Sequence, residues 1–268
     1  MTTDVAIAFR DARGPMLNDL VYCLDFLNGL AFFREYKAST WEALEIKPHR
    51  QYLDVGCGVG FDIIEMAKRF PDVEFVGVDK SEGLLDIAKS RSAGLFNARF
   101  LMNEAEGLAF PDNYFDGGRI DRSLQHMQSP AAVVKEMVRV IRPGGRIVLS
   151  EPDCGTFVLF NGREEISATM IKLWLQSFAQ PFIGRHLGQI LHNCNVVNTR
   201  WRMHALMINR LSDADVVFDL TRLKKNCVES GVLTSQEAAD WWNAAQTSSQ
   251  NGTFLACLNI LECCGQVA

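Results

Sequence analysis

Residues 53–60 read LDVGCGVG, and this stretch decides the fold. It joins a short apolar strand to a glycine-rich turn, and the residues that follow (61–70, FDIIEMAKRF) carry apolar side chains at helical spacing. Glycine has no Cβ, so such a turn lets the backbone approach a ligand closely, and the helix after it offers unpaired N–H groups. The sequence therefore predicts a ligand site where the first strand of an α/β sheet ends.

Strand and helix patterns alternate from this turn to residue 153. Such alternation is typical of βαβ units and predicts a parallel sheet that is covered by helices on both faces. Ser81 is the expected N-cap of one helix, and RPGG (142–145) is an expected turn. The predicted strands lie within 51–56, 73–79, 98–105, 114–120 and 146–153, and the predicted helices are 61–70, 81–91 and 129–141.

The two ends of the chain follow other patterns. Residues 16–47 are predicted to be helical, and residues 212–246 are helical again. Two late strands, at 196–210 and 252–265, are expected to pair antiparallel at one edge of the sheet. The expected division is an N-terminal helical cap (1–47), an α/β core (48–154), a helical lid (155–195) and a C-terminal strand–helix–strand unit (196–268).

The composition limits the class of protein. A formal net charge of −5 gives no general attraction to nucleic acid, so no nucleic-acid partner is expected. None of the eight cysteines forms a C-x-x-C pair and the histidines lack zinc spacing, so no metal site is predicted and a reducing, cytoplasmic setting is favoured. The N-terminal residues lack a signal-peptide layout, and no apolar run is long enough to span a bilayer.

Polar side chains follow three of the predicted strands. Asp54 precedes the first glycine, Asp79 ends the second strand, and Asn103-Glu104-Ala105 ends the third. The turn has G-x-G-x-G spacing with Phe61 next, whereas a dinucleotide site favours G-x-G-x-x-G. Acids at these strand ends suit an amino group, a ribose and an adenine better than a pyrophosphate. Helix capping and solvent exposure are the alternative roles for these acids.

In these residues the chain resembles the class I S-adenosylmethionine-dependent methyltransferases, in particular the small-molecule group that includes ubiquinone/menaquinone C-methyltransferases. The resemblance implies a Rossmann-like, doubly wound, mostly parallel seven-stranded sheet with an antiparallel last strand, plus N-terminal helices and a helical lid, and S-adenosylmethionine as cofactor. It covers roughly residues 35–155. The matching stretches are LDVGCGVG (53–60), EFVGVDKSEGLLDIAK (74–89), NEAEGLAFPDNYFD (103–116), DRSLQHM (121–127) and VIRPGGRIVLSEPD (140–153).

The resemblance also implies a role for individual residues. Glu104 stands where the family usually has Asp, and Asn103 where it often has Gly, so details of the adenine pocket are expected to differ. The implied cofactor residues are Gly56, Cys57 and Gly58 at the methionine part, Asp54 at its amino group, Asp79 at the ribose, Lys80, Asn103, Glu104 and Ala105 at the adenine, and Asp121 and Arg122 near the sulfonium. Tyr36, on the N-terminal helices, could touch the cofactor carboxylate or orient a substrate, and a core or interface tyrosine is the alternative.

Three residues are candidates for chemistry, each with an ordinary structural alternative. His126 follows the fourth strand and is the candidate general base, although it could simply pack or cap a helix. Glu151 ends the fifth strand at the same rim, where solvation is the alternative. Tyr22 lies on an N-terminal helix and could orient a substrate or belong to the core.

The expected lid supplies the acceptor candidates. Trp174, Phe178 and Phe182 indicate an apolar, aromatic or isoprenoid-like acceptor, and His186 could also reach it. An aromatic stripe at helical spacing is as consistent with a packed core. The acceptor and the methylated atom (O, N or C) stay open, as does a homodimer.

Methyl transfer to a small, largely apolar metabolite by in-line displacement is therefore the leading hypothesis. A quinone-pathway C-methyltransferase is the nearest alternative. A protein that binds the cofactor without transferring its methyl group, as a regulatory subunit or a cyclase, is the alternative from another class. A nicotinamide oxidoreductase is disfavoured by Phe61 and by the pattern at the adenine position.

Overall fold

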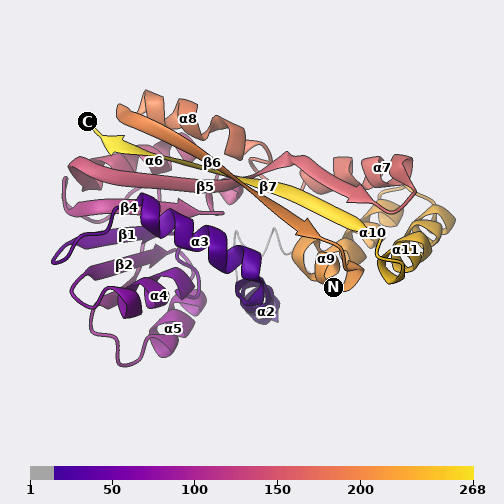
Figure 1. Cartoon of the computed structure of the whole chain (residues 1–268), viewed down its shortest axis with the longest axis horizontal. Coiled ribbons are helices and arrows are strands. Elements are labelled where there is room, and N and C mark those ends of the chain that lie inside the picture. Colours follow the sequence, from indigo (N-terminus) through magenta and orange to yellow (C-terminus); the bar gives the residue numbers. More distant parts are fainter. Residues whose placement is uncertain (1–14) are drawn as a thin grey trace.

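The computed structural model of the chain describes residues 15–268 and contains one seven-stranded sheet (Figure 1). The strand order is β3-β2-β1-β4-β5-β7-β6, and β7 runs antiparallel to both of its neighbours. The predicted doubly wound, mostly parallel sheet with an antiparallel last strand is confirmed. The strands are β1 (Gln51–Val55), β2 (Glu74–Asp79), β3 (Ala98–Met102), β4 (Phe115–Asp121), β5 (Ile141–Phe160), β6 (Val196–Ile208) and β7 (Leu255–Val267).

Helices cover both faces of the sheet. Apolar residues of α3, α4 and α5 pack on one face, and those of α6 and α8 pack on the other. The apolar residues that recur at helical spacing in the sequence are buried in the structure, as Ile63, Ile64 and Ala67 of α4 show. The described helices are α2 (Pro15–Gly29), α3 (Ala31–Ala43), α4 (Phe61–Arg69), α5 (Glu82–Arg91), the short 3₁₀ helix η1 (Leu124–His126), α6 (Pro130–Val140), α7 (Glu164–Leu175), α8 (Ile183–Asn193), α9 (Leu211–Phe218), α10 (Leu220–Glu229) and α11 (Ser235–Gln250).

Three strands continue beyond the core and build a second lobe. β5, β6 and β7 extend to the right in Figure 1, where α7, α9, α10 and α11 surround them. Trp241 is fully buried there, and its indole Nε1 donates a hydrogen bond to Ser167 Oγ at 2.9 Å. Residues 155–195 therefore do not form the single helical lid that we expected. Residues 155–160 continue β5, α7 joins the second lobe, and α8 packs on the sheet.

The expected RPGG turn lies inside β5 as an irregularity. Ile141 pairs with Phe115, whereas Arg146 pairs with Gly117, so β5 carries extra residues at this point. Gly144 relieves the bend with a φ of 80°, which a residue with a Cβ rarely adopts. The strand predicted at 146–153 is consequently longer in both directions.

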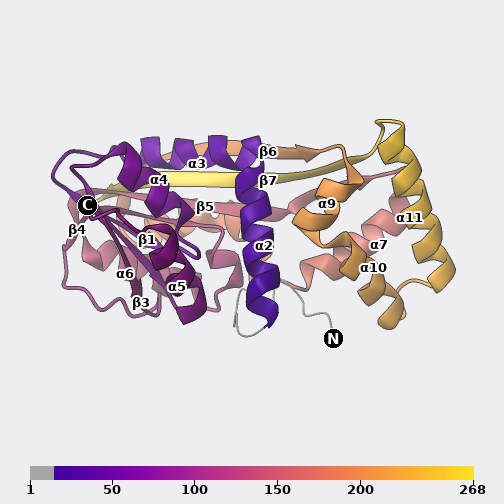
Figure 2. The ribbon, with the colours of Figure 1, turned by 90° about the horizontal axis from the view of Figure 1, so that it is seen from below.

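The two N-terminal helices connect the lobes. Figure 2 shows α2 lying across the waist between the core and the second lobe, while α3 runs along the sheet. α2 packs against α5 on one side and α9 on the other, and Leu20 contacts Val59 beside the glycine turn. Arg91 of α5 holds Asp25 of α2 through two hydrogen bonds, of 2.8 and 2.9 Å. α2 therefore closes over the turn.

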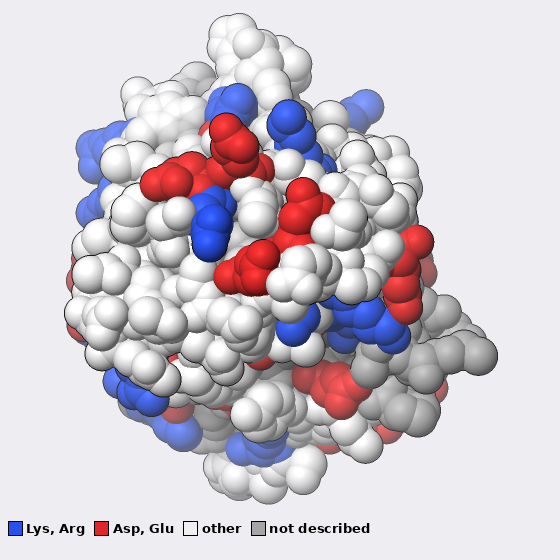
Figure 3. All heavy atoms as spheres, turned by 90° about the vertical axis from the view of Figure 1, so that its right-hand side faces the viewer, with Lys and Arg blue, Asp and Glu red and all other residues white. Residues whose placement is uncertain are grey.

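The outer end of the second lobe carries small groups of basic and acidic side chains on a mainly uncharged surface (Figure 3). Among the helices described between residues 15 and 268, none combines the length and the apolar character that a membrane crossing requires.

Candidate functional site

A cavity of about 1190 Å³ opens where β1, β2, β3 and β4 end, and it continues into the second lobe. The glycine turn (56–60), residues 79–84 and residues 102–106 line the part on the core. Ligand pockets usually measure roughly 300–1,000 Å³, so this one has room for two small molecules side by side. The predicted site at the carboxyl ends of the strands therefore coincides with a large cavity.

The glycine turn is held by backbone contacts that need small residues. The amides of Gly56 and Cys57 donate to the carbonyl of Val78 at 2.8 and 3.0 Å. A Cβ on Gly56 would lie 2.3 Å from Ser123 Oγ, and the φ of Gly56 is 70°. Any larger residue would therefore push the turn away from β4, which is why glycine is required here.

Asp79 lies at the cavity wall and braces this turn. Its two carboxylate oxygens accept hydrogen bonds from the amides of Gly58 (3.0 Å) and Ser81 (2.9 Å). Burial raises the pKa of Asp79, while these amides act in the opposite direction. Lys80, Asn103, Glu104 and Ala105, which the resemblance assigns to the adenine, line the same part of the cavity.

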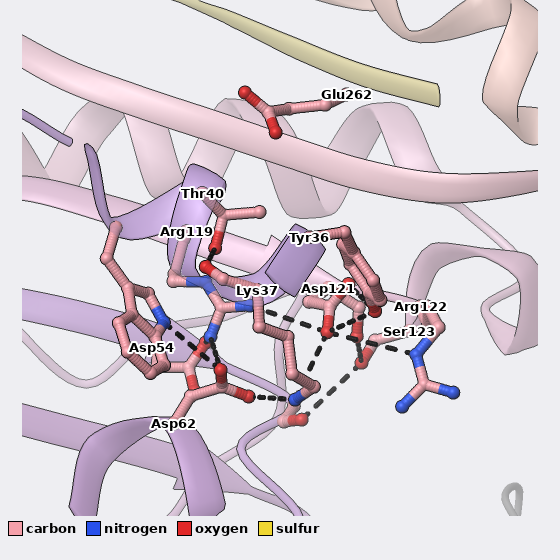
Figure 4. Close-up of polar contacts among 12 residues, drawn as sticks. Tyr36, Lys37, Thr40, Asp54, Asp62, Arg119, Asp121, Arg122, Ser123 and Glu262 are labelled. Carbon is pink, nitrogen blue, oxygen red and sulfur yellow. Dashed lines mark hydrogen bonds and ion pairs between the residues drawn. The ribbon is translucent and has the colours of Figure 1, made fainter. Parts of the chain in front are cut away.

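A buried ionic network lies under the turn, between α3, α4 and β4 (Figure 4). Arg119 of β4 is its centre and is 1% exposed. Its NH1 nitrogen lies 3.3 Å from Asp54 Oδ1 and 3.2 Å from Asp62 Oδ1, and its NH2 nitrogen lies 3.4 Å from Asp121 Oδ2. One guanidinium thus joins the first strand, the first core helix and the end of the fourth strand.

α3 supplies the other donors of this network. Lys37 Nζ contacts Asp62 Oδ2 directly and lies 3.5 Å from Asp121 Oδ2. Tyr36 donates its hydroxyl to both oxygens of Asp121, at 2.9 and 3.0 Å. Burial raises the pKa of Tyr36, and the Asp121 carboxylate raises it further, so the hydroxyl stays a donor. Tyr36 therefore touches Asp121 and is not part of the cavity wall, where we expected it to meet the cofactor.

Two carboxyl groups of the network titrate differently. Burial raises the pKa of Asp54 to about 7, although Arg119 acts to lower it. Burial also acts to raise the pKa of Asp62, but Arg119 and Lys37 together hold it well below the usual range. Asp62 is therefore the ionised carboxylate beside Arg119 and Lys37. Asp54, with its higher pKa, keeps its proton up to a higher pH than Asp62 does.

Asp54→Asn is expected to change how stability varies with pH. Because the folded pKa of Asp54 is above its unfolded value of about 3.9, the unfolded chain releases this proton first. The wild type should therefore lose stability relative to the variant as pH rises from about 4 to 7, by at most about 1.4 kcal/mol per pH unit. Urea unfolding of both proteins across this window measures the difference, and a difference that does not vary with pH would contradict the assignment.

Glu151 has a different place from the one expected. It is fully buried and does not line the cavity. Its carboxylate oxygens accept hydrogen bonds from the amides of Ser123 (2.8 Å), Leu124 (2.7 Å) and Gln125 (3.3 Å). The side chain thus holds the start of η1, the helix that carries His126.

Glu151→Ala is expected to lower the free energy of unfolding by about 2 kcal/mol, because three amides at the start of η1 lose their acceptor. Glu164→Ala, at an exposed position of α7, is the matched control and should change it by less than about 0.5 kcal/mol. Thermal or urea unfolding gives both values. Unchanged stability together with lost turnover would instead indicate a direct catalytic role.

The second lobe supplies an aromatic wall. His126, Trp174 and Phe178 line the cavity, as predicted. The Trp174 and Phe178 rings meet edge to face at 4.7 Å, and the His126 ring lies 5.9 Å from that of Phe178. Phe218 of α9 completes this wall, 6.1 Å from Trp174. This part of the cavity is suited to a flat or branched apolar molecule.

Three other candidates lie away from the cavity. Tyr22 is 63% exposed on α2 and points to solvent. Phe182 is 39% exposed and lies under the guanidinium of Arg185, 5.1 Å from it. His186 is exposed on α8. α8 packs on the sheet through its other face, so its histidine and the residue before the helix are turned away from the expected acceptor.

Sequence reasoning missed the residues that long-range folding brings to the cavity. Lys37, Asp62 and Arg119 line it, and the one available signal was an arginine inside an apolar strand. Asp219, between α9 and α10, and Arg222 and Asn226 of α10 also line the cavity. Within residues 15–268, no group of three or more His, Cys, Asp or Glu side chains is arranged to hold a metal ion.

Comparison with known proteins gives one family. Residues 46–195 match the family described as "Methyltransferase domain". The demethylmenaquinone methyltransferase of Staphylococcus aureus is 30% identical over 162 residues, which are 59% of this chain and 66% of that protein. The chain spans 65% and 66% of the length of two curated relatives that it matches.

Two solved structures share the fold. A putative methyltransferase from Bacillus halodurans has 18% identity and a TM-score of 0.64, over 86% of this chain and 98% of that one. The Haemonchus contortus phosphoethanolamine N-methyltransferase 2, in complex with phosphomonomethylethanolamine and S-adenosylhomocysteine, has 14% identity and a TM-score of 0.62, over 99% of this chain and 61% of that one.

Proposed function

Because this chain belongs to the methyltransferase-domain family and is a class I S-adenosylmethionine-dependent methyltransferase, we propose that it transfers a methyl group from S-adenosylmethionine to a small, largely apolar acceptor. The observation that carries this proposal is the single cavity that joins the glycine turn to an aromatic chamber. One end fits a cofactor and the other fits an acceptor, so both can meet in a space that protein surrounds.

The charges around the turn fit this cofactor better than a dinucleotide. A pyrophosphate would bring negative charge to a wall that is already rich in acids, whereas the amino and sulfonium groups of S-adenosylmethionine bring positive charge. The glycines leave room for the methionine part, and Asp79 is placed to accept the ribose hydroxyls. The acids on this wall are Asp54, Asp62, Asp79, Glu82, Glu104, Glu106 and Asp121, and the bases are Lys37, Lys80, Arg119 and Arg122.

S-adenosylmethionine supplies a methyl group that its sulfonium already activates. The residues of the chain then have to align the acceptor with that group and keep water away. α2 covers the turn through Leu20, and Trp174 with Phe178 closes the opposite side. His126 lies at the cavity wall and is the residue we propose as general base if the acceptor must lose a proton.

The acceptor is proposed to be aromatic or isoprenoid-like because Trp174, Phe178 and Phe218 form much of its chamber. C-methylation in a quinone pathway is one form of this proposal, and its support is the similarity to the Staphylococcus aureus enzyme. All eight cysteines are free thiols, which supports a reducing, cytoplasmic setting.

Incubation with methyl-labelled S-adenosylmethionine and a metabolite extract tests the function. We expect label to move to a small, largely apolar product that mass spectrometry identifies. Tight binding of the cofactor without label transfer to any metabolite would favour a regulatory or cyclase role. Label transfer to protein or nucleic acid alone would contradict the proposed acceptor class.

A further inference from the structure

Arg122 has an unusual position at the junction of the two ends of the cavity. It follows β4 directly, and its φ of 51° lies in the left-handed region, which is strained for an arginine. Its amide donates to the carbonyl of Ser150 at 2.8 Å, which fixes this backbone. The guanidinium lies 4.8 Å from the Phe33 ring, and in Figure 4 it points away from the ionic network. The fold therefore holds this cation at the cavity wall.

The charge of Arg122 is poorly balanced by the protein. Among residues 15–268, its ion pair is a long one, 3.8 Å from Nε to Asp121 Oδ2. Asp121 already accepts the Tyr36 hydroxyl and lies within 3.5 Å of both Arg119 and Lys37. One carboxylate is thus shared by four donors. An arginine keeps its proton under all ordinary conditions, so Arg122 presents to the cavity a cation whose ion pair with the described residues is long.

The surroundings of this cation are those of the acceptor chamber. Leu206, Ile260 and Cys23 line the same cavity as Arg122. Burial raises the pKa of the Cys23 thiol, while the charge of Arg122 lowers it and that of Asp219 raises it. Asp219 is itself bound to Arg222, at 3.1 Å, so the far wall offers a compensated pair. Arg122 therefore offers an anionic group in this cavity a cation that has no short ion pair with the described residues.

From this arrangement we infer that the acceptor carries a carboxylate on its apolar body, and that Arg122 binds that carboxylate. This inference rests on the proposed function. A sulfonium and a guanidinium facing one apolar chamber repel each other, and an anion seated between them relieves the repulsion. The planar guanidinium matches a carboxylate through two parallel hydrogen bonds, which fixes the orientation of the acceptor as well as its affinity. Arg122 then determines which acceptors bind as well as how tightly they bind.

Calorimetry with two matched probes tests the inference. Hydrocinnamate and its uncharged amide, hydrocinnamamide, have the same apolar body and are titrated into the wild type saturated with S-adenosylhomocysteine. We expect hydrocinnamate to bind about 10- to 100-fold more tightly, the usual effect of a hydrogen bond to a charged group. Arg122→Met should remove this preference. Arg99→Met, at an exposed position of β3, is the control and should preserve it.

The outcomes separate the inference from the proposed function. Equal binding of the two probes by the wild type, or no binding of either, would overturn the inference without any variant having to fold. A preference that persists in Arg122→Met would overturn it too. If that variant instead loses S-adenosylhomocysteine affinity by more than about 10-fold, Arg122 serves the carboxylate of the cofactor. Failure of the wild type to bind S-adenosylhomocysteine would be a failure of the proposed function, and the probe preference of the free protein then decides the role of Arg122.

Discussion

Replacing Arg119 by methionine is expected to lower the free energy of unfolding by about 3–5 kcal/mol. Arg119 is buried at the centre of the ionic network and lies within 3.4 Å of Asp54, Asp62 and Asp121. Its removal takes one of its two cations from the ionised Asp62 and also takes a cation from Asp121, and a buried carboxylate that loses a partner is costly. Urea unfolding followed by circular dichroism measures the loss.

Arg99→Met is the matched control for this experiment. Arg99 pairs with Glu74 at 3.1 Å on the surface of β2 and β3, and both side chains are more than half exposed. An exposed pair contributes only about 0–1 kcal/mol, so this variant should remain close to the wild type. If Arg119→Met cost no more than Arg99→Met, the network would not be the buried, mutually dependent set that its distances indicate.

Replacing Asp79 by alanine is expected to weaken S-adenosylhomocysteine binding by at least about 100-fold. We propose that the carboxylate accepts two ribose hydroxyls, and each hydrogen bond to a charged group contributes roughly 1.5–3 kcal/mol. It also accepts the amide of Gly58, so its loss frees the turn on which the methionine part would lie. Isothermal titration calorimetry of the variant and the wild type gives the ratio of dissociation constants.

Asp86→Ala on α5 is the control for Asp79. Asp86 is an exposed aspartate that pairs with Lys89 one turn along the same helix, so its removal changes the local charge without changing the cavity wall. The affinity of the Asp86→Ala variant for S-adenosylhomocysteine should match that of the wild type within about 2-fold. An unchanged affinity in Asp79→Ala would remove the ribose assignment.

The parts of the fold that follow from local spacing could be predicted from the sequence. The alternation of apolar and polar residues around LDVGCGVG places β1 and α4, and Ser81 caps α5 by accepting the amide of Leu84. The strand ends carry the cofactor candidates because parallel strands bring their carboxyl ends to one edge. This is why Asp79 and Glu104 could be proposed as candidates from the sequence, and both line the cavity.

Long-range partners could not be predicted in the same way. Pro152 and Asp153 are residues that usually end a strand, yet β5 continues to Phe160 because β7 pairs with it again from Val158 onward, after an irregularity that begins at Asp153. Glu151 has the sequence context of a site residue. Only the fold shows that its carboxylate accepts backbone amides and so holds the start of η1. Lys37 on α3 meets Asp62 on α4 through tertiary packing that no local pattern records.

The central claim is that the cavity binds S-adenosylmethionine and not a dinucleotide. Calorimetric titration of the wild type with S-adenosylhomocysteine, and separately with NAD, tests it most directly. We expect one S-adenosylhomocysteine per chain with a dissociation constant on the order of micromolar, and no heat of binding with NAD. Saturable binding of NAD, with none of S-adenosylhomocysteine, would contradict the account.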